Sequence, residues 1–253
     1  MMNHLQLELC LDELLASRQF KDYSPNGLQV EGRAEVQRIV TGVTACQALL
    51  DEAVRRQADA VLVHHGYFWG NEAAQIRGMK KRRLQTLLRH DINLYAYHLP
   101  LDAHPVLGNN AQLANLLGIS VLRPLEVDDP RSLGLVGELD VPLSGEEFAE
   151  LLAQRLTRQP LFCPGRSGGP IRRIAWCSGG GQSFIGLAAE QGIDAFLTGE
   201  APEQTIHVAR EMGIDFFAAG HHATERYGVQ ALGHWLATEH GLDVSFVDID
   251  NPV

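Results

Sequence analysis

Histidines stand where a predicted strand ends. The apolar run 60–63 is typical of a buried parallel strand, and it leads directly into His64, His65 and Gly66. Neighbouring side chains of an extended backbone point in opposite directions, so one metal ion rarely takes both imidazoles. Two ions, or one ion with the second histidine supporting a ligand, fit this pair better.

A histidine and a carboxylate recur at two other predicted strand ends. His98 and Asp102 lie four residues apart just beyond the predicted strand 92–97, and His221 and Glu225 lie where a later strand passes into a helix. One helical turn brings this second pair onto one face. The three segments supply enough nitrogen and oxygen ligands for two divalent ions. Glu225 could bridge two ions about 3.5–4 Å apart, the separation that two-metal hydrolytic sites require.

Several features of these clusters stay open at this point. His98 either ligates a metal or orients Asp102, and His104 and His222 are interpreted as neighbours rather than ligands. The ligand types suit iron, manganese, zinc, cobalt or nickel, and they argue only against a soft-metal site. A His-His pair alone is more often a coincidence, but three clusters at three strand ends favour a metal site.

Other motifs have weaker interpretations. The loop Gly179–Gly181 follows a predicted strand, so its backbone N–H groups could hold a phosphate or carboxylate, although a tight turn explains it equally well. The basic run 77–83 is interpreted as a solvated helix face, with phosphate or nucleic-acid contact as the alternative. The segment 22–32 contains Pro-Asn-Gly and is interpreted as a structural turn.

The elements that position these residues follow from the pattern of apolar side chains. Segment 36–43 alternates like a strand, 47–56 has helical spacing and 60–63 is a second strand, which together predict a β-α-β unit. A charged helix over 78–90 and a strand over 92–97 follow. A further helix over 110–117 ends at Gly118, the expected C-cap residue.

The sequence contains a weak internal repeat. A shift of 135 positions lays 36–65 on 171–200 without a gap, and 92–97 resembles 214–219. The shift makes Glu200 the counterpart of His65. The identical pairs are Arg38/Arg173, Ile39/Ile174, Gln47/Gln182, Ala53/Ala188, Asp59/Asp194, Ala60/Ala195 and Leu62/Leu197.

This repeat predicts an α/β protein with two similar α/β domains, mostly parallel or mixed sheets, and helices packed on them. We place the first domain at residues 1–125 and the second at 126–253, because a proline-bounded acidic segment at 124–130 is typical of a linker. The final alternating strand, 242–249, could pair with either half.

Composition narrows the class of protein. The 253 residues are 45% hydrophobic, enough to bury a core, and 31 acidic against 21 basic residues give a net charge of −10. This charge disfavours nucleic acid and anionic lipid as partners. The start of the chain lacks a secretory pattern, and no segment approaches the ~20 apolar residues of a membrane span. We therefore expect a cytoplasmic protein whose four scattered cysteines are packed thiols.

The assembled motifs resemble the Nif-three-like family, also called GTP cyclohydrolase 1 type 2 homologs. The resemblance runs from the segment at 22–30 to the closing segment 246–252, and its most specific parts are Val-His-His-Gly at 63–66, His-Leu-Pro-Leu-Asp-Ala-His at 98–104 and Gly-His-His-Ala-Thr-Glu at 220–225. It implies a dinuclear site with Glu225 as the bridge and His98 beside it. The implied ligands are His64, His65, Asp102, His221 and Glu225. It also implies two interlinked domains and a ring-shaped homohexamer whose sites face an internal cavity.

Two classes of function are consistent with these residues. One is a metal-dependent hydrolase that acts on a nucleotide or a related small molecule, with His98 as a candidate proton shuttle. The other is a non-catalytic metal-binding regulatory or scaffold protein, because the sequence lacks an obvious nucleophile and a purine-reading motif. DNA handling within a ring is a third hypothesis, which the net charge of −10 disfavours.

Overall fold

The chain folds into two compact α/β units in a computed structural model that describes residues 1–165 and 169–253. Unit 1 comprises Met1–Leu101 and Gly228–Asp250, and unit 2 comprises Asp102–Tyr227 and Asn251–Val253. The chain leaves unit 1 within α4 (Leu99–Ala103) and returns to it within α9 (His221–His240). This division differs from the boundary at 125/126 that the acidic linker suggested, since 102–125 group with unit 2 and 228–250 with unit 1.

Unit 1 is built on a five-stranded sheet with the order β13-β4-β5-β6-β2. The first four strands are parallel and β2 is antiparallel to β6. The final strand of the chain therefore pairs with β4, in the first unit. The strands are β2 (Gly27–Val30), β4 (Arg38–Thr44), β5 (Ala60–His65), β6 (Asn93–Ala96) and β13 (Asp243–Phe246), and β1 (Met2–Asn3) pairs separately with β3 (Glu35–Val36).

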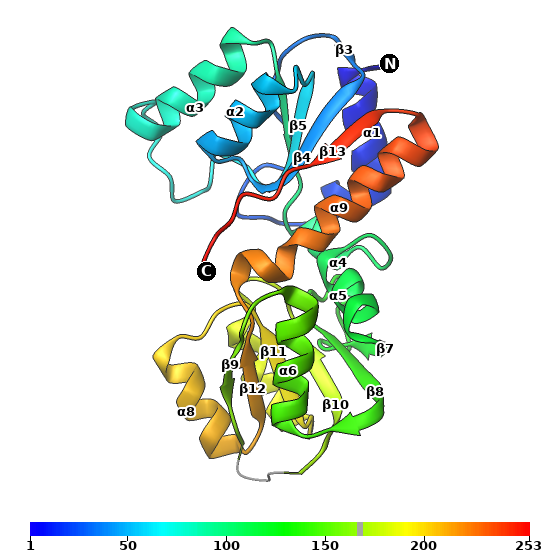
Figure 1. Cartoon of the computed structure of the whole chain (residues 1–253), viewed down its shortest axis with the longest axis vertical. Coiled ribbons are helices and arrows are strands. Elements are labelled where there is room, and N and C mark those ends of the chain that lie inside the picture. Colours follow the sequence, from blue (N-terminus) through cyan, green and yellow to red (C-terminus); the bar gives the residue numbers. More distant parts are fainter. Residues whose placement is uncertain (166–168) are drawn as a thin grey trace. The chain divides into compact units, whose positions relative to one another are not determined.

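Helices cover both faces of this sheet (Figure 1). On one face α2 (Gln47–Arg55) and α3 (Gly78–Arg89) bury leucines against β4, β5 and β6 in a single cluster. On the other face α1 (His4–Leu15) lies on β6, where the Tyr95 hydroxyl donates to the His4 carbonyl at 2.8 Å. Helix α9 approaches closely because Gly233 faces Thr41 and Val244 with no side chain between them. The sheet is therefore buried on both faces, which explains its continuous apolar strands.

Unit 2 is built on a six-stranded sheet with the order β7-β8-β10-β11-β12-β9. Its central strands β10, β11 and β12 are parallel, and β7, β8 and β9 pair antiparallel with their neighbours. The strands are β7 (Ile119–Pro124), β8 (Leu135–Leu143), β9 (Leu161–Cys163), β10 (Ile171–Trp176), β11 (Ala195–Thr198) and β12 (Asp215–Ala218).

Alternate residues of these strands enter two different cores. Leu197 and Phe217 pack with α5 (Asn109–Leu117) and α6 (Gly145–Leu156) on one face. Phe196 and Phe216 pack with α7 (Ile185–Glu190) and α8 (Glu203–Met212) on the other. Figure 1 shows α6 and α8 on the two sides of this sheet. The period of two along each strand thus decides which core a side chain fills.

The two units contain the same strand arrangement, as the internal repeat predicted. Three parallel strands, β4-β5-β6 or β10-β11-β12, are followed by an antiparallel strand, β2 or β9. The aspartate of each repeat accepts hydrogen bonds from two consecutive backbone N–H groups of the neighbouring strand region. Asp59 accepts from the backbone N–H groups of 37 and 38 at 2.9 and 2.8 Å, and Asp194 accepts from those of 172 and 173 at 3.0 and 2.8 Å.

Three smaller expectations can be compared with the structure. The basic run forms the start of α3, where most of its side chains are exposed and Lys80 pairs with Glu72 at 3.1 Å. All four cysteines are free thiols. Among residues 1–165 and 169–253, no helix combines the length and the apolar character that crossing a membrane demands.

Candidate metal centre

His64 lies at the carboxyl end of β5 and is fully buried. Its Nδ1 is 3.0 Å from the carbonyl oxygen of Tyr97. A carbonyl only accepts, so Nδ1 carries the proton and Nε2 carries the lone pair. This is the tautomer that metal-binding histidines adopt when a carbonyl orients the ring.

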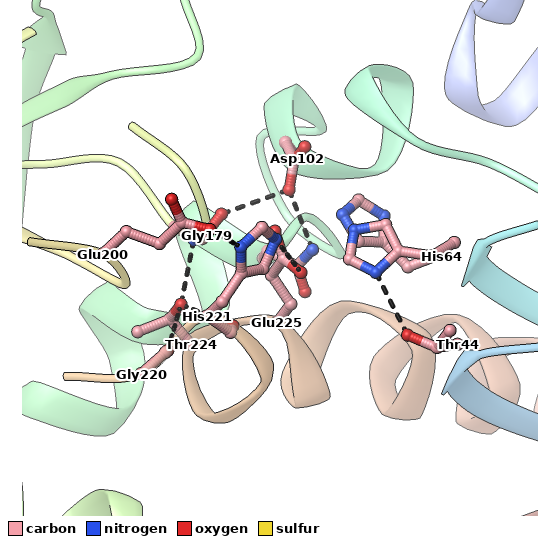
Figure 2. A network of polar contacts seen from close by, with 12 residues as sticks. Thr44, His64, Asp102, Gly179, Glu200, Gly220, His221, Thr224 and Glu225 are labelled. Carbon is pink, nitrogen blue, oxygen red and sulfur yellow. Dashed lines mark hydrogen bonds and ion pairs between the residues drawn. The ribbon is translucent and has the colours of Figure 1, made fainter. Parts of the chain in front are cut away.

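His65 is the last residue of the same strand and is partly exposed. Its Nδ1 lies 3.2 Å from the hydroxyl of Thr44, which ends the neighbouring strand β4. The Thr44 hydroxyl and its contact are drawn in Figure 2. Because a hydroxyl can accept, this contact also allows an Nδ1–H tautomer.

His98 follows β6 and is held by Asp22. Its Nδ1 donates to the Asp22 carboxylate at 2.7 Å, and its backbone N–H donates to the Asn26 side chain at 2.8 Å. Asp22 also accepts from the Leu99 N–H at 2.9 Å and from the Asn26 amide at 3.0 Å. The segment predicted to be a structural turn therefore fixes the orientation of His98.

The acceptor role of Asp22 affects its ionisation. Burial raises the pKa of this carboxyl, but the hydrogen bond and charge of His98, with the donors from Asn26 and Leu99, lower it by more. The net pKa is below its ordinary value, so Asp22 is a carboxylate at neutral pH. When the ring of His98 is neutral, a carboxylate at Nδ1 keeps its proton on Nδ1 and its lone pair on Nε2.

Three imidazoles therefore converge within unit 1. One nitrogen from each of His64, His65 and His98 lies within 4.8 Å of the others. The ring of His64 lies 4.5 Å from that of His65 and 5.1 Å from that of His98, measured between ring centroids. The two histidines of β5 remain close although they alternate along the strand, because His64 turns toward the next strand.

In unit 2, His221 lies between two carboxylates at the start of α9 (Figure 2). Its Nδ1 is 2.6 Å from Glu200 and its Nε2 is 3.2 Å from Glu225. Burial lowers the pKa of His221, but hydrogen bonds and charge from Glu225 and Glu200 outweigh it and raise the pKa to about 9. The two carboxylates therefore favour a positive charge on the ring. A metal ion bound at Nε2 could supply this charge in place of the proton.

Asp102 and Glu225 are buried carboxylates of the same unit, with exposed fractions of 6% and 3%. An oxygen of each lies within 4.8 Å of an oxygen of the other. Asp102 accepts from the amide of Asn109 at 2.9 Å and from the hydroxyl of Ser178 at 3.1 Å. Burial raises the pKa of the Cys177 thiol most, and the charges of Asp102 and Glu225 raise it further. Cys177 is therefore a packed thiol of low reactivity.

The loop Gly179–Gly181 is shaped by this site. A Cβ on Gly179, whose φ is +58°, would collide with the carboxylate of Glu225. Its N–H donates to the Thr224 hydroxyl at 2.9 Å, which Figure 2 shows between Gly179 and Gly220. The glycine is therefore required where the loop passes Glu225, and the tight turn is one role of this loop.

His104 and His222 have local contacts. The Nδ1 of His104 accepts from the backbone N–H groups of 106 and 107 at 3.2 and 2.9 Å, so it closes a turn. The N–H of His222 donates to the carbonyl of Val253 at 3.0 Å. Thr44 and Asp22 were not predicted as partners of candidate ligands, because their contacts join segments that are 21 and 76 residues apart in the sequence. One feature of the sequence pointed to Glu200: the internal repeat aligns it with His65.

The donor chemistry of both units fits a divalent metal. Unit 1 offers imidazoles whose Nδ1 atoms contact oxygen, and unit 2 offers one imidazole with two buried carboxylates. Buried carboxylates are stable when a cation compensates their charge. Nitrogen and oxygen donors without thiolate suit the first-row divalent ions from manganese to zinc.

Comparisons with known proteins give the family. Residues 2–252 match the family model Duf34/NIF3 (NGG1p interacting factor 3). A relative from Yersinia pestis, called GTP cyclohydrolase 1 type 2 homolog, is 61% identical over 99% of this chain and 100% of its own. The solved structure of protein ybgI, of unknown function, is 60% identical with a TM-score of 0.96, and that of a protein from Thermus thermophilus is 38% identical with a TM-score of 0.89. Each covers 100% of both chains. The chain belongs to the Duf34/NIF3 family.

Proposed function

We propose that the chain binds two divalent metal ions and hydrolyses a nucleotide or a related small molecule. The proposed metal ligands are His64, His65, Asp102, His221 and Glu225, with Glu225 as the bridge. The observation that carries the proposal is the repeated contact between an imidazole Nδ1 and an oxygen atom, at His64, His65 and His221. This pattern prepares Nε2 as a metal ligand.

The residues of the chain have distinct roles in this proposal. Bound divalent ions supply Lewis acidity that makes water a nucleophile near neutral pH. Glu200 orients His221 through Nδ1, and Ser178 and Asn109 orient Asp102. His98, which Asp22 holds with its lone pair on Nε2, accepts or returns a proton during hydrolysis.

A cavity beside Asp102 provides room for a small molecule. It has a volume of about 350 Å³ and is mostly apolar, with Asp102, His104 and Arg123 among its polar lining residues. Apolar walls with a few polar groups are typical of small-molecule sites. A metal ligand in the wall places the reacting end of a bound molecule near the proposed site.

Metal analysis of the purified chain tests the proposal. We expect two divalent ions per wild-type chain, and at most one in Asp102→Ala or Glu225→Gln, because each change removes a ligand. Two matched controls should keep two ions: Glu239→Gln, an exposed carboxylate of α9, and His207→Ala, an exposed histidine of α8. A wild-type chain without bound metal contradicts the proposal.

Turnover separates the hydrolase from a metal-binding scaffold. We expect hydrolysis of guanosine triphosphate or another nucleotide by the metal-loaded chain, with a loss of at least about 100-fold in kcat for Asp102→Ala. Equal rates for the wild-type chain and this variant would show that the metals have a structural role only. The two-metal part of the proposal would then stand without the hydrolase.

A further inference from the structure

Arg158 is a cation without an ion pair among residues 1–165 and 169–253. Its Nε is buried and meets no hydrogen-bond acceptor, and its side chain forms no ion pair with a described carboxylate. The side chain as a whole is only half-buried. The guanidinium is therefore fixed at its inner end while its outer nitrogens reach solvent.

The backbone holds Arg158 at this place. Helix α6 begins after a capping box at Ser144 and ends at Leu156, and its C-cap residue Thr157 has the left-handed values φ 54° and ψ 37°. A β-branched residue rarely adopts this conformation, and it costs about 1 kcal/mol or more. The N–H of Arg158 then donates to the Ala153 carbonyl at 3.2 Å. The chain is thus turned sharply just before β9.

This turn brings Arg158 to the carboxyl end of β12. Strand β9 starts at Leu161, which pairs with Ala218 in β12. Arg158 packs on Gly220, since a Cβ at Gly220 would lie 2.5 Å from the guanidinium Nε. Gly220, with φ +97°, leaves the space that Arg158 fills, and the next residue is His221.

The carboxyl ends of parallel strands are where ligands collect in α/β sheets. At this edge the neighbouring glycines 179 and 199 also lack side chains, and a Cβ on Gly199 would meet His221. Glu200 and Glu225 pair with His221 and not with Arg158. The guanidinium is thus an unused set of donors next to a proposed metal ligand.

We propose that Arg158 binds the phosphate group of a phosphate-bearing substrate beside His221. This inference rests on the proposed function and names the class of its substrate. A guanidinium offers paired N–H donors that match two oxygens of a phosphate. A doubly charged phosphate is also attracted more strongly than a carboxylate to Arg158 and to the metal ion proposed at His221. This stronger attraction offsets the electrostatic repulsion from Glu200.

Binding to the metal-loaded chain tests the inference, with inorganic phosphate and guanosine monophosphate as probes in calorimetric titrations. We expect Arg158→Gln to weaken binding of both probes about 10- to 100-fold, the effect of losing a charge-assisted pair. Arg158→Lys should restore part of the affinity, because it keeps the charge but not the fork. Arg155→Gln is the matched control, because Arg155 is an exposed arginine of the last turn of α6.

The results separate this inference from the proposed function. Metal content should be equal in the wild-type chain and all three variants. A wild-type chain that holds metal but binds neither probe at about 10 mM, or an Arg158→Gln chain with wild-type affinity for both, would overturn the inference alone. If Arg158→Gln does not fold, Arg158→Lys decides, since unchanged affinity for both probes there removes the bidentate role. A wild-type chain without metal would instead refute the proposed function.

Discussion

Asp22 holds the strand end that carries His98, and its four hydrogen bonds make it a strong residue-scale target. The carboxylate accepts from two backbone N–H groups, from Asn26 and from His98. Asp22→Asn keeps the shape but removes the charge and one acceptor. We expect it to lower the free energy of unfolding by about 1–3 kcal/mol at neutral pH. Urea unfolding followed by circular dichroism measures this difference.

The pH dependence of the Asp22 effect has a defined sign. The folded-state pKa of Asp22 is below its ordinary value of 3.8, so its stabilisation is fully present above that value and is lost as pH falls through the lower folded-state pKa. Wild type and Asp22→Asn should therefore converge in stability below pH 3.8. Asp250→Asn, at an exposed carboxylate, should match wild type throughout. A difference between wild type and Asp22→Asn that stays constant down to about pH 2 would contradict this account.

The candidate metal ligands could be predicted from the sequence, because the end of a strand is recognisable from neighbouring residues alone. His64 and His65 end an apolar run, and the structure places them at the end of β5. Asp22 and Thr44 were not accessible, because each meets its histidine across a distance that only the folded sheet closes. Asp22 is 76 residues from His98, and no local spacing signals that contact.

The repeated βαβ element makes a prediction about its two aspartates. Asp59 is buried and accepts from Arg33 at 2.9 Å in addition to two backbone donors. Asp194 is exposed, and within the described part of the chain it accepts from the backbone donors alone. We expect Asp59→Ala to cost about 2–4 kcal/mol of unfolding free energy and Asp194→Ala about 1 kcal/mol. Urea unfolding of the two variants side by side provides the measurement. Equal costs at the two positions would contradict this account, because the two aspartates share their backbone contacts and differ in burial and in the contact with Arg33.

The helices and strands could be predicted more completely than the side-chain contacts or the unit boundaries. Alternation and helical spacing indicated β4, α2 and β5, and the repeat indicated that β10 and β11 have the same order. The antiparallel partners β2 and β9 were not predicted, because strands of four and three residues are too short to show a periodic pattern. Asp59 and Asp194 are one of the identical pairs of the repeat, and the structure shows that both accept from the backbone at the start of the preceding strand.

At the scale of the whole molecule, the boundaries between the two units differ from the expected boundary at 125/126. Both crossings fall within helices, α4 and α9, rather than in a linker. The acidic, proline-bounded segment 124–130 has the composition of a linker but lies within unit 2. The segment 243–246 joins the first sheet by parallel pairing with β4, which alternation along that strand alone could not specify.

Assembly is the last prediction at the scale of the whole molecule. Strand β7 is an edge of its sheet and exposes Val121 and Leu122 by 50% and 55%. Apolar side chains on an unpaired edge favour association with another chain. The family resemblance implies a ring-shaped homohexamer, so we expect a mass six times the 27.8 kDa of one chain in native mass spectrometry.

The same edge gives a matched pair of variants for the hexamer. Leu122→Asp places a charge on β7, and we expect it to yield smaller species, because burying that charge at an interface costs several kcal/mol. Leu88→Asp changes a similarly exposed leucine of α3, 61% exposed, and should leave the mass unchanged. A wild-type chain that remains monomeric at micromolar concentration would contradict the ring. A hexamer that survives Leu122→Asp but not Leu88→Asp would move the interface from β7 to α3.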